Sequence, residues 1–135
     1  MNTKIFSIFL AVAVFLVSVT ACATGASARV SNIYLTNAID DTNKITTFAP
    51  TDTIFVFFDV NKIESNSEFQ TNWYALNVEG LDPTTPIRVT NHAYDDETTI
   101  IAFIENKDGG FLAGQYKVEI NLDGSKVGEQ QFTIQ

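Results

Sequence analysis

The C-terminal stretch constrains the fold of this chain more than any other, because residues 114–134 have the pattern of a β-hairpin. Apolar and polar side chains alternate over residues 114–122, and the apolar ones are Tyr116, Val118, Ile120 and Leu122. An alternation of period two is typical of a strand with one buried face. Asp123-Gly124 then predicts a tight type I′ turn, which requires positive φ at both central residues. The return strand places Phe132 and Ile134 on one face, so other strands must cover the hairpin.

Length and charge limit the class of protein. With 135 residues the chain can form one well-packed domain but not two. All 16 acidic residues and seven of the eight basic residues lie after residue 22, so this part carries a net charge of −9. A surface this negative argues against a nucleic-acid partner and against docking on anionic lipid by charge. We therefore expect an acidic, well-solvated domain that does not bind nucleic acid.

Residues 1–21 have the layout of an export signal. Lys4 and the amino terminus give a basic start, and a long apolar run follows. Residues 19–22, Val-Thr-Ala-Cys, resemble a bacterial lipobox, in which the cysteine is lipidated and becomes the first residue of the mature protein. The only cysteine of the chain falls at that position. We predict a lipoprotein signal peptide over residues 1–21, lipidation of Cys22, and a short tether over residues 22–28.

Two other interpretations of the leader stay open. Residues 26–28, Ala-Ser-Ala, fit the cleavage site of an ordinary secretory signal, and the apolar run is just long enough to remain as an uncleaved anchor. A lone thiol in an exported protein needs an explanation, and lipidation or removal with the leader supplies one. In each case we expect the domain to lie outside the cytoplasm, and the lipoprotein interpretation places it in the cell envelope, anchored to a membrane. No cysteine follows Cys22, so packing must stabilise the domain without a disulfide.

Residues 29–135 read as a succession of short strands. The strongest are residues 53–60 and 98–104, which are rich in aromatic and β-branched side chains. Weaker extended segments lie at residues 30–35, 46–48, 69–78 and 87–89. We find no amphipathic helix outside the leader. About seven or eight short strands predict an all-β domain, an antiparallel sandwich that spans residues 29–135.

Three stretches carry a resemblance to a known family: residues 48–54 (Phe-Ala-Pro-Thr-Asp-Thr-Ile), Trp73, and residues 111–124. Within the last, residues 112–116 (Leu-x-Gly-x-Tyr) are similar to the start of the penultimate strand in immunoglobulin-like sandwiches, where the tyrosine hydroxyl bonds back to nearby backbone. The domain thus resembles the immunoglobulin-like or fibronectin-type-III-like sandwiches of bacterial envelope lipoproteins. The resemblance implies a structural role for Tyr116 and no particular activity.

Few residues could perform chemistry. His92 is the only histidine, and it lies close to the acidic run Asp95–Glu97. A transition-metal site or a nucleophilic triad needs more partners than these. Calcium could bind Asp95–Glu97, but the spacing is not that of a calcium loop, and we interpret this run as a hydrated turn. We expect Asp52 and Asp59 to cap the ends of one strand, and we predict no enzyme activity, no metal and no cofactor.

The two strongest strands are apolar on both faces, which suggests an interaction surface. We place one set toward the core: Ile54, Val56, Phe58, Ile101 and Phe103. The outer patch then consists of Phe55, Phe57, Ile100 and Ile104. A contiguous exposed apolar patch usually marks a partner site. The alternative is that residues 37–48, or another part of the same chain, cover the patch.

These observations predict a non-catalytic, lipid-anchored envelope protein that works as a protein-interaction or accessory module. Its expected partners are the membrane, through the N-terminal lipid, and an envelope or extracellular protein. The alternative function is a small-ligand or carbohydrate-binding module that uses exposed aromatic residues such as Tyr74 or Tyr94. Trp73 could also stack on a ligand, but a place in the core of the sandwich explains it better.

Overall fold

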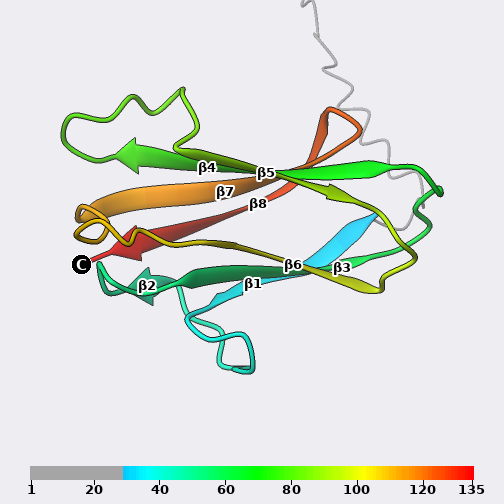
Figure 1. The fold of residues 1–135 in the computed structure, drawn as a ribbon, viewed down its shortest axis with the longest axis horizontal. Helices are drawn as coiled ribbons and strands as arrows, with labels where there is room; N and C mark the ends of the chain where they lie inside the picture. Colours follow the sequence, from blue (N-terminus) through cyan, green and yellow to red (C-terminus); the bar gives the residue numbers. More distant parts are fainter. Residues whose placement is uncertain (1–28) are drawn as a thin grey trace, which may run out of the picture.

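A computed structural model describes residues 29–135 and contains strands but no helix in that range (Figure 1). The predicted signal peptide, Cys22 and the tether lie outside the described residues. The strands are β1 (Val30–Thr36), β2 (Thr47–Phe48), β3 (Ile54–Val60), β4 (Glu68–Asn77), β5 (Arg88–Ala93), β6 (Thr99–Ile104), β7 (Gly114–Leu122) and β8 (Ser125–Ile134). The prediction of an all-β domain with seven or eight strands is confirmed.

The strands form two sheets that lie in two layers (Figure 1). The smaller sheet has the order β1-β3-β6, and the larger has the order β2-β8-β7-β4-β5. All pairings are antiparallel except that of β2 with β8. This arrangement is consistent with a β-sandwich.

The C-terminal hairpin forms as the sequence predicts. Asp123 and Gly124 have φ angles of 48° and 85° between the paired residues Leu122 and Ser125. The turn also fixes the start of β4: the backbone N–H of Glu68 donates to Oδ1 of Asp123 (2.8 Å), and the N–H of Asp123 donates to the carbonyl of Glu68 (2.9 Å). Two strands far apart in sequence are therefore joined at the hairpin tip.

The core lies between the two sheets and contains the inward-facing side chain of every second strand residue. Trp73, Phe58, Phe69 and Tyr116 are its largest members, and none is more than 1% exposed. The indole of Trp73 packs edge-on to Phe132, with ring centroids 5.9 Å apart. The interpretation of Trp73 as a core residue is confirmed.

Tyr116 forms the predicted bond to nearby backbone. Its hydroxyl donates to the carbonyl of Leu112 at 2.6 Å, and its ring stacks on Phe132 with centroids 5.5 Å apart. Burial raises the pKa of the Tyr116 phenol, because the phenolate would lose water without gaining a charged partner.

Replacing Tyr116 by phenylalanine is expected to lower the free energy of unfolding by about 1–2 kcal/mol, because the carbonyl of Leu112 loses its donor. The raised pKa means that the tyrosine stabilises the fold below the pKa of the unfolded phenol, and that this contribution is lost as the pH rises through the folded-state value. Urea denaturation at neutral and alkaline pH tests both points. If the variant and the parent lose stability equally at high pH, another group is responsible.

One lateral side of the molecule is closed. After β1 the chain crosses to the larger sheet, where β2 pairs with the end of β8. Farther along, β1 lies directly against β8: a Cβ atom on Gly128 would lie 2.5 Å from Cδ1 of Ile33. The opposite side is different, because β5 and β6 are the last strands of their sheets and each has a single neighbour.

Candidate functional site

The predicted outer patch is right for β3 and wrong for β6. Phe55 and Phe57 face outward as predicted, but Ile100 and Ile104 are core residues, 2% and 5% exposed. The reason is the register. Phe55 lies opposite Phe103 and Phe57 opposite Ile101, and directly opposed residues of an antiparallel pair share a face. Because both faces of β6 are apolar, its sequence pattern does not determine which face turns inward.

One residue of the outer face, Phe57, is covered by the same chain, as the alternative interpretation predicts. Tyr34 of β1 stacks on Phe57, with ring centroids 5.0 Å apart and planes 4° apart, and Nζ of Lys44 lies 4.6 Å above the Tyr34 ring. Phe57 is accordingly only 7% exposed. What remains open is the part nearest the edge of the sheet, formed by Phe55, Ile101 and Phe103.

β6 has a free backbone edge beside this apolar surface. The N–H of Val60 donates to the carbonyl of Thr98 at 2.9 Å, and bonded and non-bonded positions alternate along an antiparallel pair. The β6 residues that bond to β3 are therefore Ile100, Ala102 and Ile104. Those whose N–H and C=O groups point away from the sheet are Thr99, Ile101 and Phe103. No charge, proline or bulge protects this edge within residues 99–104.

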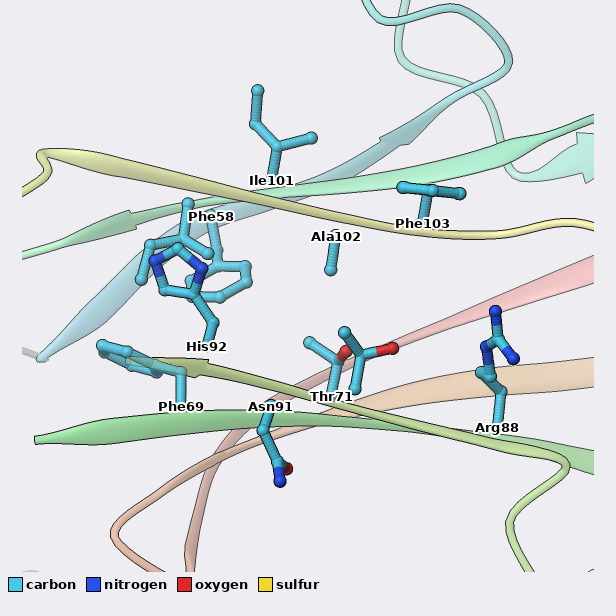
Figure 2. A pocket seen from close by; sticks show the side chains of 11 residues that line it. Phe58, Phe69, Thr71, Arg88, Asn91, His92, Ile101, Ala102 and Phe103 are labelled. Atoms are coloured by element: carbon cyan, nitrogen blue, oxygen red, sulfur yellow. The ribbon is translucent and has the colours of Figure 1, made fainter. Parts of the chain in front are cut away.

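β5 presents a second free edge next to that of β6. The N–H of Tyr94 donates to the carbonyl of Ser67 at 3.0 Å, so the same alternation leaves three residues with outward-pointing backbone groups. They are Val89, Asn91 and Ala93. The two edges flank one opening between the sheets (Figure 2).

The opening consists of two cavities that share Arg88, of about 160 Å³ and about 330 Å³, and we name it the lateral groove. The first lies between β5 and β6 and has room for several water molecules or a side chain. Its apolar lining includes Phe58, Phe69, Ile100 and Ala102. Seven large apolar side chains are well exposed within residues 29–135, and five of them line the groove: Leu81, Ile87, Ile101, Phe103 and Leu112.

The wall of the groove on the β5 side is polar. Arg88, Thr90 and His92 pair with inward-facing residues of β4, so they point toward the other sheet rather than to the outside. Figure 2 shows Arg88 and His92 reaching up from β5, with Ala102 pointing down from β6. The apolar side chains of β6 thus face the polar side chains of β5 across the first cavity.

A buried hydroxyl without a partner lies in the same cavity. Thr71 of β4 is 3% exposed, lines the first cavity, and its Oγ1 has no hydrogen-bond partner among the described residues. In Figure 2 its side chain points toward the smaller sheet. A buried hydroxyl left unpaired costs free energy, so this position favours a polar group supplied from outside the fold.

The basic residue of the groove is not ion-paired. The lysines at 107, 117 and 126 each contact a glutamate, but Arg88 forms no salt bridge within residues 29–135. The domain is acidic elsewhere, so Arg88 is an isolated positive charge in the middle of the groove.

His92, near the end of β5, lines one end of the groove and is hydrogen-bonded to the connection that follows it, which contains Asp95–Glu97. Nε2 of His92 lies 2.6 Å from Oε1 of Glu97, and the N–H of Asp95 donates to Oε2 of Glu97 at 2.7 Å. Backbone N–H groups of Asp95 and of Glu97 itself, with a smaller effect of His92, lower the pKa of the Glu97 carboxyl. No cluster of three or more metal-ligating side chains occurs within residues 29–135.

The other predicted residues have structural contacts. Asp52 accepts the N–H of Ala49 at 2.9 Å, so its carboxylate closes the turn before β3 and does not bond to the strand itself. Asp59 joins three strands, because Asn32 and Thr99 both donate to its carboxylate, at 3.0 and 2.8 Å. The candidate sugar-stacking rings are partly covered: Lys117 lies 5.1 Å from the centre of Tyr74, and Tyr94 packs on Phe69.

Sequence reasoning missed the groove, although it identified both strands that border it. Only weak features of the sequence hint at the groove. They are an arginine on a short, mostly polar strand and two leucines in connecting segments, Leu81 and Leu112. These residues come from three separate segments, and only the sheet order brings them together.

The sequence matches no protein-family model and no curated protein. Among solved structures, the chain is similar to the Pseudomonas fluorescens alkylpurine DNA glycosylase AlkC bound to DNA containing an abasic site analog, with a TM-score of 0.50 and 9% identity. The match covers 79% of this chain and 30% of the glycosylase chain, so it concerns less than a third of that protein. At 9% identity, this match shows a similarity of fold alone.

Two exclusions made from the sequence are contradicted by this comparison. We predicted that the chain is not an enzyme and does not bind nucleic acid, yet a similar fold occurs within an enzyme that was solved on DNA. The net charge of −9 and the scarcity of catalytic side chains are therefore not sufficient grounds to exclude an enzyme or a nucleic-acid partner.

Within residues 29–135 we find no helix long and apolar enough to cross a membrane.

Proposed function

We propose that this chain is a lipid-anchored protein of the bacterial envelope whose immunoglobulin-like domain binds another protein through its β5–β6 side. The leader and the lipobox-like residues 19–22 support the anchor at Cys22. The bond from Tyr116 to Leu112 supports the immunoglobulin-like type of sandwich.

One observation carries the binding role: two unpaired strand edges lie side by side and are bordered by exposed apolar side chains. Exposed edges and apolar patches are features that proteins normally cover. Here Ile101 and Phe103 are 43% and 47% exposed on the very strand whose backbone is free. A protein partner would cover both features at once.

The binding role is tested by photocrosslinking in cells that produce the full chain. We expect benzoylphenylalanine at position 103 to form an adduct with one partner protein. The matched control places the same residue at Tyr74, an aromatic position on the outer face of the larger sheet. Equal adducts at both positions, or none at 103, would contradict the proposal. The DNA-bound structural neighbour adds a second arm, in which an adduct to DNA at position 103 would also contradict it.

The anchor is tested separately with an alkynyl fatty acid. The full chain is expected to incorporate the label and to sediment with membranes, whereas Cys22→Ser is expected to lose the label. Label that persists in Cys22→Ser, or its absence from the parent chain, would show that residues 19–22 are not a lipobox.

A further inference from the structure

The strongest unexplained feature of the domain is the lateral groove, with its free β6 edge, its unpaired Arg88 and the partnerless hydroxyl of Thr71. We propose that an extended segment of the partner protein adds to β6 as an antiparallel fourth strand of the smaller sheet and places a carboxylate side chain opposite Arg88. This inference rests on the proposed function and specifies how the partner binds.

The backbone of β6 supplies the hydrogen bonds for such a strand. Thr99, Ile101 and Phe103 direct their N–H and C=O groups outward, and both existing pairings in this sheet are antiparallel. An added strand would lie about 4.8 Å from β6, at the mouth of the groove between β6 and β5. Strand addition to an exposed sheet edge is a common mode of peptide recognition.

The two faces of the added strand meet different surroundings. Side chains opposite Ile101 and Phe103 lie on the outer face, where they extend the apolar surface that includes Phe55. The alternate side chains point into the groove, toward the polar β5 wall and Thr71. The segment is therefore expected to alternate apolar residues with polar ones.

Charge determines which polar residues fit. Arg88 has no acidic partner in the described chain and borders both cavities, so an aspartate or glutamate of the segment complements it. The flanks of β6 are acidic, with Asp95–Glu97 before it and Glu105 after it. A segment with one acid in the middle and basic ends matches this pattern.

A second copy of this chain fits less well. β6 contains no acid that could meet Arg88, so β6 pairing with its own copy would leave that charge unpaired. An antiparallel pair of β6 strands would also bring Glu105 of one copy close to the acidic turn of the other. Two domains of charge −9 repel one another as well.

The test uses the full chain purified in detergent and fluorescent eight-residue peptides, with binding followed by anisotropy. The peptides carry valine at alternate positions, lysine at both ends, threonine elsewhere, and aspartate, asparagine or lysine at one inward position. We expect the aspartate peptide to bind about fivefold more tightly than the lysine peptide, since aspartate attracts Arg88 and lysine repels it. The difference in affinity stays this small because the ion pair with Arg88 is solvent-exposed. In Arg88→Glu this preference is expected to reverse, and Arg88→Gln is expected to remove it.

Backbone methylation of the peptide tests strand addition itself. N-methylation of two valines removes donors that face β6 and is expected to weaken binding by about tenfold. N-methylation of two inward-facing residues, whose N–H groups point away from β6, is expected to change binding by less than about twofold. Circular dichroism of each variant confirms that it is folded.

Several results would overturn the inference: no peptide binds, both methylated peptides bind alike, or Arg88→Glu keeps the preference for aspartate. Sedimentation of the full chain as a dimer that Phe103→Lys dissociates would assign the groove to a second copy. If the peptides fail while the adduct at position 103 forms, the mode of binding is wrong and the proposed function stands. If the adduct at position 103 does not form either, both the strand-addition mode and the proposed function are contradicted.

Discussion

Replacing Trp73 by alanine is expected to lower the free energy of unfolding by about 3–5 kcal/mol, the largest effect of any single core truncation in this domain. Trp73 is fully buried on the central part of β4, packs on Phe132, and is the largest side chain of the core. Small domains have only about 5–15 kcal/mol of stability in total, and residues 29–135 contain no cysteine that could form a disulfide. Urea denaturation followed by circular dichroism measures the loss, since the variant lacks the only tryptophan.

The next residue provides a matched control for this truncation. Tyr74 points to the opposite face of β4, is partly exposed, and contacts Lys117 through its ring. Tyr74→Ala is expected to cost less than about 1 kcal/mol, because it leaves no cavity in the core. Equal losses for the two variants would mean that the space between the sheets is not packed around Trp73.

Replacing Gly114 by alanine is expected to cost about 2–4 kcal/mol of unfolding free energy. Gly114 has a φ angle of 150°, a conformation that residues with a side chain rarely adopt. Its missing Cβ would lie 2.3 Å from the carbonyl oxygen of Asn77 and 2.7 Å from Cγ2 of Val78. Backbone of β4 would have to move to admit even a methyl group. Urea denaturation of the folded variant, or its failure to accumulate, provides the measurement.

Gly124 separates the two causes of that loss. It also has a positive φ, 85°, but a Cβ there would meet nothing within 4 Å. Gly124→Ala is therefore expected to lower the free energy of unfolding by only about 1 kcal/mol, the cost of placing a residue with a side chain at positive φ. If Gly114→Ala proves no more harmful than Gly124→Ala, the close approach of β7 to residues 77–78 does not constrain the fold.

Local sequence patterns predicted the strands and their tight connections well. The alternation in residues 114–122, the Asp-Gly turn and the Tyr116 bond all depend on residues close together in the chain. The β3 faces were also predicted correctly. The β6 faces were not, because a strand with isoleucine or phenylalanine on both faces satisfies either register equally well.

The candidate site was predicted only in part, for a related reason. Phe55 and Phe57 were assigned to the outer face, but the stack of Tyr34 on Phe57 depends on the pairing of β1 with β3. Likewise, nothing local to Arg88 indicates that it lies across a groove from Phe103. That neighbourhood exists because β5 and β6 end their respective sheets on the same side.

The sequence by itself determined that residues 29–135 form an all-β domain with a closing hairpin, since period-two patterns and turn residues act over a few positions. Only the tertiary structure decided which apolar face is buried, which part of the outer patch Tyr34 covers, and where the edges stay open. These depend on pairings between strands distant in sequence, whose choice rests on the packing of all eight strands together.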